Sequence, residues 1–244
     1  MMKTNIDTCP ICGSLTEFAF KVPFRNGKPN LDGSNYNPDV EYNYCGVCKL
    51  YYSKTQRTWT DKDFLDQVYN ARYAGYDSDI TNANGNRPNA MYRLMHDEFQ
   101  NYLKSNAYIL DYGCGRGFWV DKLNKEGFKH IYGHDPYYRP DPEVLRDKYD
   151  LVTCTEVIEH DYDIVETFKK FSAMLYLGGA LLVSTDMTDE MEKVSENYYT
   201  CPRVGHVMLY AKETLAYLAN QAGFSLIHLS RMSSMQFHLF IKQR

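Results

Sequence analysis

Three glycines at alternate positions in this 244-residue sequence have a spacing typical of a ligand-binding loop. They are Gly113, Gly115 and Gly117, in the stretch ILDYGCGRGFW, where a short apolar run meets the acid Asp111 just before the first glycine. A glycine-rich loop after a strand lets a ligand approach the backbone closely, and many such loops bind nucleotides. The stretch therefore predicts a nucleotide-type ligand at the end of a strand.

The spacing of the glycines and the acid ahead of them indicate which ligand is expected. A dinucleotide site has the pattern G-x-G-x-x-G and places a pyrophosphate at a helix N-terminus, whereas this loop is G-x-G-x-G. A carboxylate such as Asp111 repels a pyrophosphate and attracts a cation. S-adenosylmethionine has an ammonium group and a sulfonium but no phosphate. We therefore expect the loop to bind its methionine arm and Asp111 to serve its ammonium, directly or through water.

A second acid follows the glycine loop at a distance that suits the same ligand. Asp135 ends the segment HIYGHD, 18 residues after Gly117. An acid at the end of the next strand can accept hydrogen bonds from both hydroxyls of a ribose. We predict this role for Asp135; the alternative is a turn aspartate before Pro136.

Four of the seven cysteines form two C-x-x-C pairs, in CPICG and CGVCK. Two such pairs can supply four thiolates to a tetrahedral zinc ion, which leaves no open position and makes the zinc structural. The alternatives are four reduced structural cysteines or a redox pair, and a redox pair is disfavoured because neither motif lies in a βαβ context. The predicted ligands of a structural Zn²⁺ are Cys9, Cys12, Cys45 and Cys48.

Alternating apolar and amphipathic segments are expected to position these residues. AYILDYGCG, KHIYGHD, YDLVTCTEVIEH and ALLVSTD are predicted strands, with FWVDKLNKEG, DIVETFKKFSAMLYLGG and AKETLAYLANQAG as helices. Such alternation favours a mostly parallel, doubly wound α/β sheet, whose ligands bind beyond the carboxyl ends of the strands. FSLIHLS and MQFHLFIKQ predict two closing strands, paired as a hairpin around Met232–Met235, with an antiparallel strand at the end of the sheet.

Three parts are expected along the chain. Residues 1–55 would form a small zinc-ribbon-like module, with short strands beside the cysteine pairs. Residues 56–88 are polar and rich in aromatic residues, and predict either a lid or collar over a substrate or a segment packed on the surface of the main domain. Within this connector we expect a short helix near 61–70. Residues 89–244 would form the ligand-binding α/β domain.

Composition excludes some functions. The formal net charge is −4 and there is no long basic run, which disfavours nucleic acid as a partner. No apolar run approaches a membrane span, and the first residues lack the apolar core of a signal peptide. Paired cysteines in a cytosolic chain indicate metal binding or catalysis. We therefore expect a cytoplasmic protein with no membrane partner.

Together the motifs resemble the class I S-adenosylmethionine-dependent methyltransferases over about residues 88–244. The matching pieces are ILDYGCGRG, IYGHDPY, YDLVTCTEVIEH and GHVMLYAKETLAYLANQAGF. The resemblance implies a Rossmann-like sheet of seven strands with the last antiparallel, and a strand 151–156 whose end flanks the methionine arm. The expected cofactor-binding residues are Asp111, Gly113, Cys114, Gly115, Gly117, Asp135, Pro136, Tyr137, Cys154 and Thr155.

The sequence departs from the family pattern after Asp135. Only PYYRPDPEVLRDK separates Asp135 from Tyr149, so the third strand and its adenine-contacting acid are abbreviated. Tyr137 and Tyr138 are candidates to stack on the adenine instead.

A hydroxyl or carbon acid that accepts a methyl group must lose a proton, so we looked for a general base. The candidates are His160, in EVIEHD, and His206, in CPRVGHVMLY, although either ring could serve only packing or hydrogen bonding. Arg203, in the same segment as His206, is expected either to bind a phosphate or carboxylate of the acceptor or to be solvated.

A zinc module ahead of such a core resembles the sugar C- and O-methyltransferases. The C-methyltransferases have a further C-terminal domain that we do not expect here, which disfavours methylation of carbon. We expect a small-molecule acceptor, in particular a hydroxyl of a sugar or nucleotide-linked sugar. The alternative is a non-catalytic module that binds S-adenosylmethionine or a nucleotide and recognises a partner through its zinc segment. The glycine spacing disfavours a nicotinamide-dependent oxidoreductase.

Overall fold

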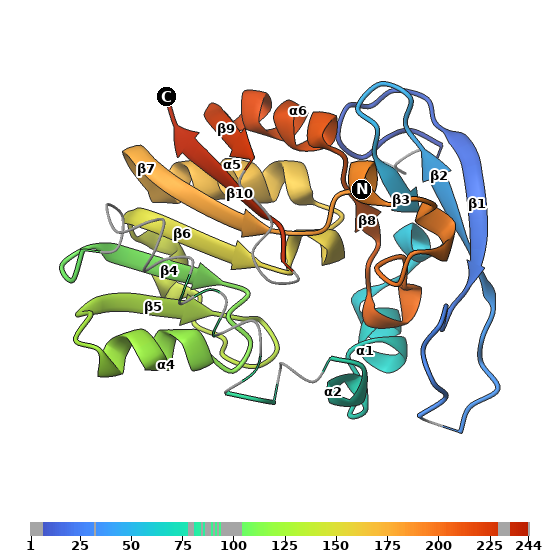
Figure 1. The fold of residues 1–244 in the computed structure, drawn as a ribbon, viewed down its shortest axis with the longest axis horizontal. Coiled ribbons are helices and arrows are strands. Elements are labelled where there is room, and N and C mark those ends of the chain that lie inside the picture. The colour runs from blue at the N-terminus through green and yellow to red at the C-terminus, as the bar shows by residue number, and fades with distance from the viewer. Residues whose placement is uncertain are drawn as a thin grey trace. The chain divides into compact units, whose positions relative to one another are not determined.

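The chain folds into two compact units, each with its own β-sheet (Figure 1). The computed structural model describes residues 7–31, 33–77, 81–83, 85, 89, 91, 93, 104–228 and 235–243, with only the backbone of His228. The first unit comprises residues up to 77 together with 159–165 and 186–218. The second comprises 78–158, 166–185 and 219–244.

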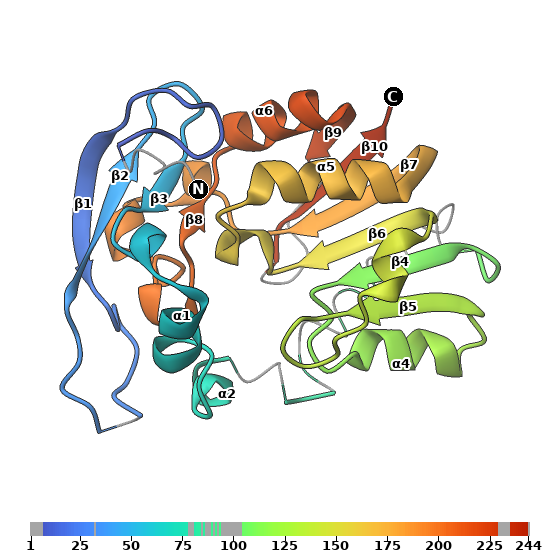
Figure 2. The same ribbon diagram turned by 180° about the vertical axis from the view of Figure 1, so that it is seen from behind.

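A six-stranded sheet forms the second unit (Figures 1 and 2). Its strands, in spatial order, are β5 (His130–His134), β4 (Tyr108–Tyr112), β6 (Tyr149–Thr155), β7 (Leu175–Ser184), β10 (Phe237–Lys242) and β9 (Phe224–His228). The first four are parallel, and β10 is antiparallel to both of its neighbours. The α/β sheet, its antiparallel last strand and the pairing of the two closing strands are thus confirmed. The connection 229–234 lies outside the described residues.

Helices α4 (Phe118–Lys125) and α5 (Ile164–Met174) bury apolar residues of this sheet. Both α5 and α6 (Lys212–Ala222) begin with residues of the first unit and end with residues of the second. Trp119 and Leu123 of α4 are buried in a cluster with Ile109 and Leu151. Figure 2 shows α5 along the sheet, and the ring centroid of its Phe168 lies 5.2 Å from that of Phe240 in β10. Central strand β6 is largely buried, with only Asp150 and Thr155 half-buried, as expected of a strand that is covered on both faces.

The region between β5 and β6 is shorter than the resemblance to methyltransferases implies. Residues 135–148 contain only one short 3₁₀ helix, η3 (Glu143–Arg146), and no strand. Because each parallel crossover takes a dozen or more residues, this segment has room for one crossover and none for an additional strand and a second crossover. The described sheet therefore has six strands, and the predicted abbreviation of the third-strand region explains the difference from seven.

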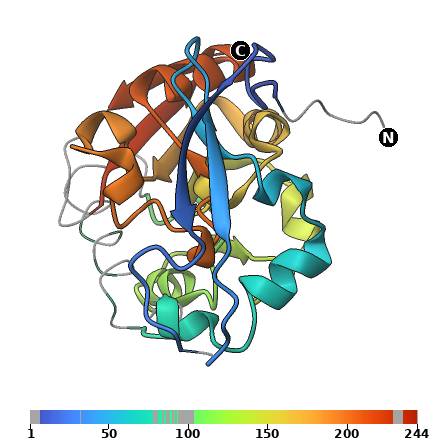
Figure 3. The same ribbon diagram turned by 90° about the vertical axis from the view of Figure 1, so that its right-hand side faces the viewer.

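A four-stranded antiparallel sheet forms the core of the first unit, in the order β1 (Glu17–Pro23), β2 (Asp39–Tyr44), β3 (Tyr51–Ser53) and β8 (Met208–Leu209). Figure 3 shows β1 and β2 side by side. These two strands and β3 confirm the strands predicted beside the cysteine pairs. Strand β8 was not predicted, because two residues are too few to show an alternating pattern.

The polar segment after β3 is partly helical. It forms η1 (Gln56–Thr58), α1 (Asp61–Gln67) and α2 (Tyr73–Tyr76). Helix α1 begins at a capping box, in which Asp63 N–H donates to Thr60 Oγ1 and Thr60 N–H donates to Asp63 Oδ2. The short helix predicted near 61–70 is confirmed.

The first unit also contains four short 3₁₀ helices between residues 158 and 204. They are η4 (Ile158–His160), at the boundary between the units, and η5 (Thr188–Glu190), η6 (Val194–Glu196) and η7 (Pro202–Val204). Gln56 Nε2 donates to the carbonyl of Pro202 (3.1 Å), and Tyr42 Oη donates to the carbonyl of His206 (2.7 Å). The segment before β8 is therefore attached to the N-terminal strands by side chain to backbone hydrogen bonds. In the part of the chain that the structure describes, no helix has the length and apolar character needed to cross a membrane.

Candidate cofactor and metal sites

The glycine loop joins the carboxyl end of β4 to the start of α4. The amides of Gly113 and Cys114 both donate to the carbonyl of His134, at the end of β5 (2.8 and 3.2 Å), and Gly117 lies at the N-cap of α4. Gly113 has a φ of 75°, and a Cβ atom there would lie 2.3 Å from Cγ2 of Val157. The loop therefore packs tightly between the ends of β5 and β6, as a close backbone approach to a ligand at this edge requires.

Cys114 lies within the loop and packs inward. A Cβ atom on Gly133 of β5 would lie 2.9 Å from Cys114 Sγ, so the thiol lies close against that strand. Burial raises the pKa of the Cys114 thiol well above its ordinary value, and the negative charges of Asp111 and Asp135 raise it further. The neutral side chain of Cys114 therefore supports the loop from inside. Its backbone, rather than its thiol, is suited to contact a ligand.

Asp111 is a buried acid at the end of β4, with 7% of its surface exposed. Thr153 is its register partner in β6 and donates to Asp111 Oδ1 through Oγ1 (2.8 Å). Burial raises the pKa of Asp111 to about 7, although the hydrogen bond from Thr153 opposes the shift. A buried carboxyl of this kind becomes ionised when a cation binds beside it. Thr153 was missed at the sequence level; its position opposite Asp111 in a parallel pair of strands is the signal that would have found it.

Asp135 is oriented by three backbone amides. Its Oδ1 accepts from the amides of Tyr137 and Tyr138 (both 2.9 Å), and its Oδ2 accepts from the amide of Gly115 (3.1 Å). The structure thus brings the two predicted motifs into direct contact, at the ends of neighbouring strands β4 and β5.

The residues after Asp135 form an exposed turn. Pro136 is exposed, and Tyr137 has 49% of its surface exposed. The guanidinium of Arg116 lies 5.8 Å from the ring centroid of Tyr138. Of the two tyrosines proposed for adenine, Tyr138 thus lies close to the glycine loop, and Tyr137 is about half exposed.

Cys154 and Thr155 end strand β6, and consecutive strand residues point to opposite faces. Cys154 is fully buried, whereas Thr155 is half-buried and its Oγ1 lies 3.2 Å from Sδ of Met91. Thr155 lies on the same face of β6 as Thr153, the partner of Asp111, whereas Cys154 points to the opposite face.

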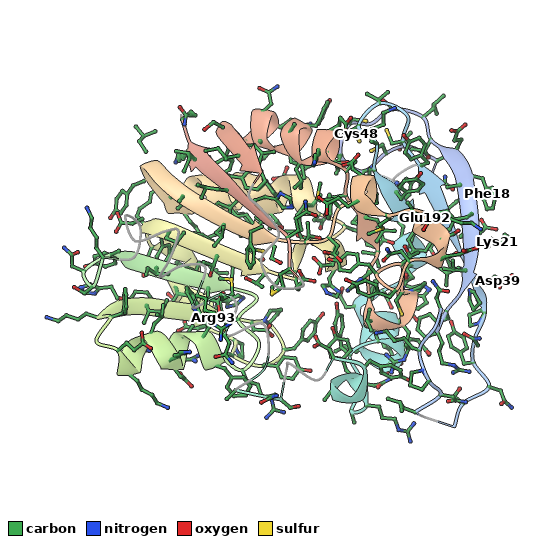
Figure 4. All side chains as sticks on the ribbon, in the orientation of Figure 1. Phe18, Lys21, Asp39, Cys48, Arg93 and Glu192 are labelled. Atoms are coloured by element: carbon green, nitrogen blue, oxygen red, sulfur yellow. The ribbon has the colours of Figure 1, made fainter. Side chains whose placement is uncertain are left out.

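The four paired cysteines come together in the first unit, and Cys48 is labelled in Figure 4. The Sγ atoms of Cys9 and Cys48 are 3.5 Å apart, those of Cys12 and Cys45 are 3.4 Å apart, and all four lie within 4.8 Å of one another. A tetrahedral zinc ion with Zn–S bonds of about 2.3 Å separates its sulfur ligands by about 3.8 Å. The cluster therefore has dimensions that fit zinc.

Backbone amides also face these sulfurs. The hydrogen bond from Cys48, together with weaker ones from the amides of Cys12 and Ile11, lowers the pKa of Cys9 to about 5 against the effect of burial. Burial raises the pKa of Cys45, and hydrogen bonds from the amides of Cys48 and Val47 oppose that shift. Donors directed at sulfur favour thiolates, which are the form that binds a metal.

The two candidate bases are neighbours in the first unit, although they are 46 positions apart in the sequence. The ring centroids of His160 and His206 are 5.0 Å apart. Nδ1 of His160 lies 3.0 Å from the carbonyl oxygen of Gly205, and Nδ1 of His206 lies 2.7 Å from that of Tyr199. Because a carbonyl only accepts, Nδ1 carries the proton of each neutral ring and Nε2 is the basic nitrogen.

Arg203 is buried, with 1% of its surface exposed, so the solvated alternative is wrong. Its Nη1 donates to the carbonyl of Val68 (2.9 Å), its Nη2 donates to Asn70 Oδ1 (3.2 Å), and its Cζ lies 4.1 Å from the ring centroid of Tyr76. The guanidinium thus holds the aromatic segment 68–76 against η7, within the first unit.

Replacing Gly113 by Ala tests the packing of the loop. Gly127 is the matched control, because its φ is also positive (93°) but a Cβ atom there would meet open space. A left-handed alanine costs about 1 kcal/mol, and at Gly113 the contact with Val157 adds to that cost. We expect Gly113→Ala to lower the free energy of unfolding clearly more than Gly127→Ala in chemical denaturation. Equal losses would show that the loop is not tightly packed.

Replacing Asp111 by Asn tests the raised pKa. A carboxyl with a pKa near 4 in the unfolded chain and about 7 in the folded one destabilises the fold increasingly from pH 4 to pH 7, and constantly above that. The Asn variant lacks this cost and its Oδ1 still accepts from Thr153. The free energy of unfolding of Asp111→Asn minus that of the wild type should therefore increase by on the order of 2 kcal/mol from pH 5 to pH 8.

Thermal and chemical unfolding at the two pH values measure this difference, with exposed Asp147→Asn as the control. A stability difference between wild type and Asp111→Asn that is the same at pH 5 and pH 8 would contradict the assignment.

Comparison with known proteins agrees with this geometry. Residues 83–229, more than half of the chain, match the family described as "Methyltransferase domain". No curated protein matches the chain. Among solved structures, a SAM-dependent methyltransferase from Archaeoglobus fulgidus is similar with a TM-score of 0.50 and 16% identity, over 68% of this chain and 99% of that one.

Other similar structures are more distant. An O-methyltransferase family protein from Burkholderia thailandensis has a TM-score of 0.48 and 14% identity, over 73% of this chain and 64% of that one, so this chain spans less than two thirds of it. Magnesium protoporphyrin IX methyltransferase from Synechocystis, solved with bound SAM, has a TM-score of 0.46 and 14% identity, over 76% and 99%. The Archaeoglobus structure shows the shared fold, and the family match over residues 83–229 establishes that the chain belongs to the methyltransferase-domain family.

Proposed function

We propose that the protein transfers a methyl group from S-adenosylmethionine to a small-molecule acceptor. The observation that carries this proposal is the buried acid Asp111, with its pKa raised to about 7, beside a glycine loop that contacts Asp135. Membership of the methyltransferase-domain family supports it. The bound cofactor supplies an activated methyl group on a sulfonium, and the residues of this chain bind and orient it.

Two acids would bind two parts of the cofactor, the methionine arm and the ribose. Asp111 would bind the ammonium of the methionine arm, since a neighbouring cation favours the ionised form of a buried carboxyl. Asp135 would bind the ribose. A carboxylate offers about four acceptor positions, and three of those of Asp135 already accept from amides. We therefore propose that the ribose binds mainly at Oδ2, which accepts from Gly115 alone.

We infer that the acceptor is a hydroxyl of a sugar or a nucleotide-linked sugar. This inference rests on the resemblance of the cysteine module and methyltransferase core to sugar methyltransferases. The tyrosine-rich segment in the first unit agrees with it, because aromatic rings with polar tips suit polyhydroxylated ligands. The proton of such a hydroxyl would be taken by His206 or His160, through the basic nitrogen Nε2. We also propose that Cys9, Cys12, Cys45 and Cys48 hold a structural zinc.

Calorimetry tests the ribose role of Asp135. We expect S-adenosylmethionine and S-adenosylhomocysteine to bind the wild type, and Asp135→Ala to weaken both at least tenfold, since it removes a charged hydrogen-bond acceptor worth about 1.5–3 kcal/mol. Asp147→Asn, exposed in the same unit, should bind as the wild type does. Failure of both ligands to bind the folded wild-type protein would refute the proposed function.

Formation of S-adenosylhomocysteine, measured with a panel of sugars and nucleotide-linked sugars, tests the reaction itself. We expect turnover with at least one hydroxyl acceptor, lost on replacement of Asp135 by Ala at cofactor concentrations that saturate only the wild type. Binding of the cofactor without turnover on any acceptor would favour the non-catalytic binding module.

A further inference from the structure

We infer that Glu159, His160 and His206 form a second metal site, which holds a divalent transition-metal ion and zinc in particular. All three residues belong to the first unit and are separate from the four cysteines. The inference uses only contacts within that unit, so it does not rest on the proposed methyl transfer.

The three side chains converge on one point. One ligand atom from each lies within 4.8 Å of those from the other two, and Nε2 of His160 lies 3.8 Å from Oε1 of Glu159. Nitrogen and oxygen ligands at 2.0–2.2 Å from a tetrahedral zinc ion are about 3.4 Å apart. Small side-chain rotations would therefore close the set around an ion.

Both histidines are oriented as metal ligands usually are. A ligating histidine commonly donates its other ring N–H to a backbone carbonyl or a carboxylate, which fixes the tautomer and the direction of the lone pair. Here the carbonyls of Gly205 and Tyr199 take this part for His160 and His206. The same hydrogen bonds assign the lone pair to Nε2 on both rings.

The backbone holds the two segments together. Val207 N–H donates to the carbonyl of Glu159 (2.8 Å), and Tyr42 Oη donates to that of His206 (2.7 Å). A Cβ atom on Gly205 would lie 3.0 Å from Nδ1 of His160, so the backbone at Gly205 lies close against that ring nitrogen. The site is thus built from preorganised backbone, which is what a precise ligand geometry needs.

The charge and type of the ligands select the ion. Glu159 is fully buried, and a buried carboxylate is stabilised when it coordinates a metal. Imidazole suits zinc and other transition metals, whereas magnesium and calcium prefer oxygen ligands. Two histidines and one glutamate form the ligand set of catalytic zinc sites, with a fourth position for water or substrate. The four-cysteine cluster has no such position.

This site also bears on the proposed general base. A nitrogen that ligates a metal has no lone pair with which to accept a proton. If the proposed function is right, the metal-bound pair would act through the ion, which lowers the pKa of a bound hydroxyl so that its proton is released to water.

Metal analysis of the full chain, saturated with zinc and then dialysed, tests the inference. We expect two zinc ions per chain in the wild type, and one in each of Glu159→Gln, His160→Asn and His206→Asn. An asparagine at either position can keep a donor near Nδ1 while it removes Nε2. Cys45→Ser should lose the other ion. Glu192→Gln (Figure 4) and His130→Asn, which lie outside the site, should keep both.

Cobalt in place of zinc identifies which site each variant has lost and shows whether the variant is folded. Cobalt bound to thiolates gives an intense sulfur-to-metal charge-transfer band, which Glu159→Gln and the two histidine variants should keep while they lose the weaker bands of a nitrogen–oxygen site. A wild type that binds a single ion, with thiolate spectra alone, would overturn the inference. So would two ions retained by all three variants.

Calorimetry with S-adenosylmethionine separates this test from that of the proposed function, because the three variants lie outside the cofactor-binding residues. If the wild type binds only the thiolate ion and His206→Asn still abolishes turnover, the histidines act as bases and the metal inference fails while methyl transfer stands. If two ions are bound but no methyl acceptor is found, the metal site stands by itself.

Discussion

The parallel pairing of β4 with β5 and β6 is the constraint on which the second unit depends. It brings the carboxyl ends of three strands to one edge, so that Asp111, Asp135 and Thr153 lie near one another although they are distant in sequence. The glycine loop then turns back across this edge through the amides of Gly113 and Cys114 on the carbonyl of His134. A change of register by one residue would move Asp111 to the opposite face of the sheet.

The features that could be predicted from the sequence are those encoded over short stretches. The alternation of strands and helices, the glycine loop, the short helix near 61–70 and the cysteine pairs each depend on a few neighbouring residues, and the structure has all of them. The partner of Asp111 could not be read in this way, because Thr153 belongs to another strand and depends on register. Strand β8 and the contact of His160 with His206 depend on tertiary folding for the same reason. The burial of Arg203 was also missed, since its partners are a carbonyl, an amide side chain and an aromatic ring rather than an acid.

The first unit is held together largely by side chains that reach backbone carbonyls. Tyr42, Gln56 and Arg203 each bond a carbonyl more than a hundred positions away. Any residue can accept such a bond through its backbone carbonyl. The sequence of the accepting segment therefore gives no sign that the bond is there. Two of these bonds hold the segment that carries His206, and the amide of Val207 joins this segment to the carbonyl of Glu159, beside His160. Two histidines with no common motif thereby come to lie 5.0 Å apart.

Strand β8 has a consequence for the order in which the chain folds. The cysteine pairs and strands β1 to β3 are made before β4 to β7 of the other unit, whereas β8, which completes their sheet, follows those strands. Contacts between such distant residues form slowly, because a long loop must be closed first. The sheet of the first unit therefore keeps an open edge at β3 until β8 is made, and a metal bound by the cysteines would hold its turns until that strand pairs.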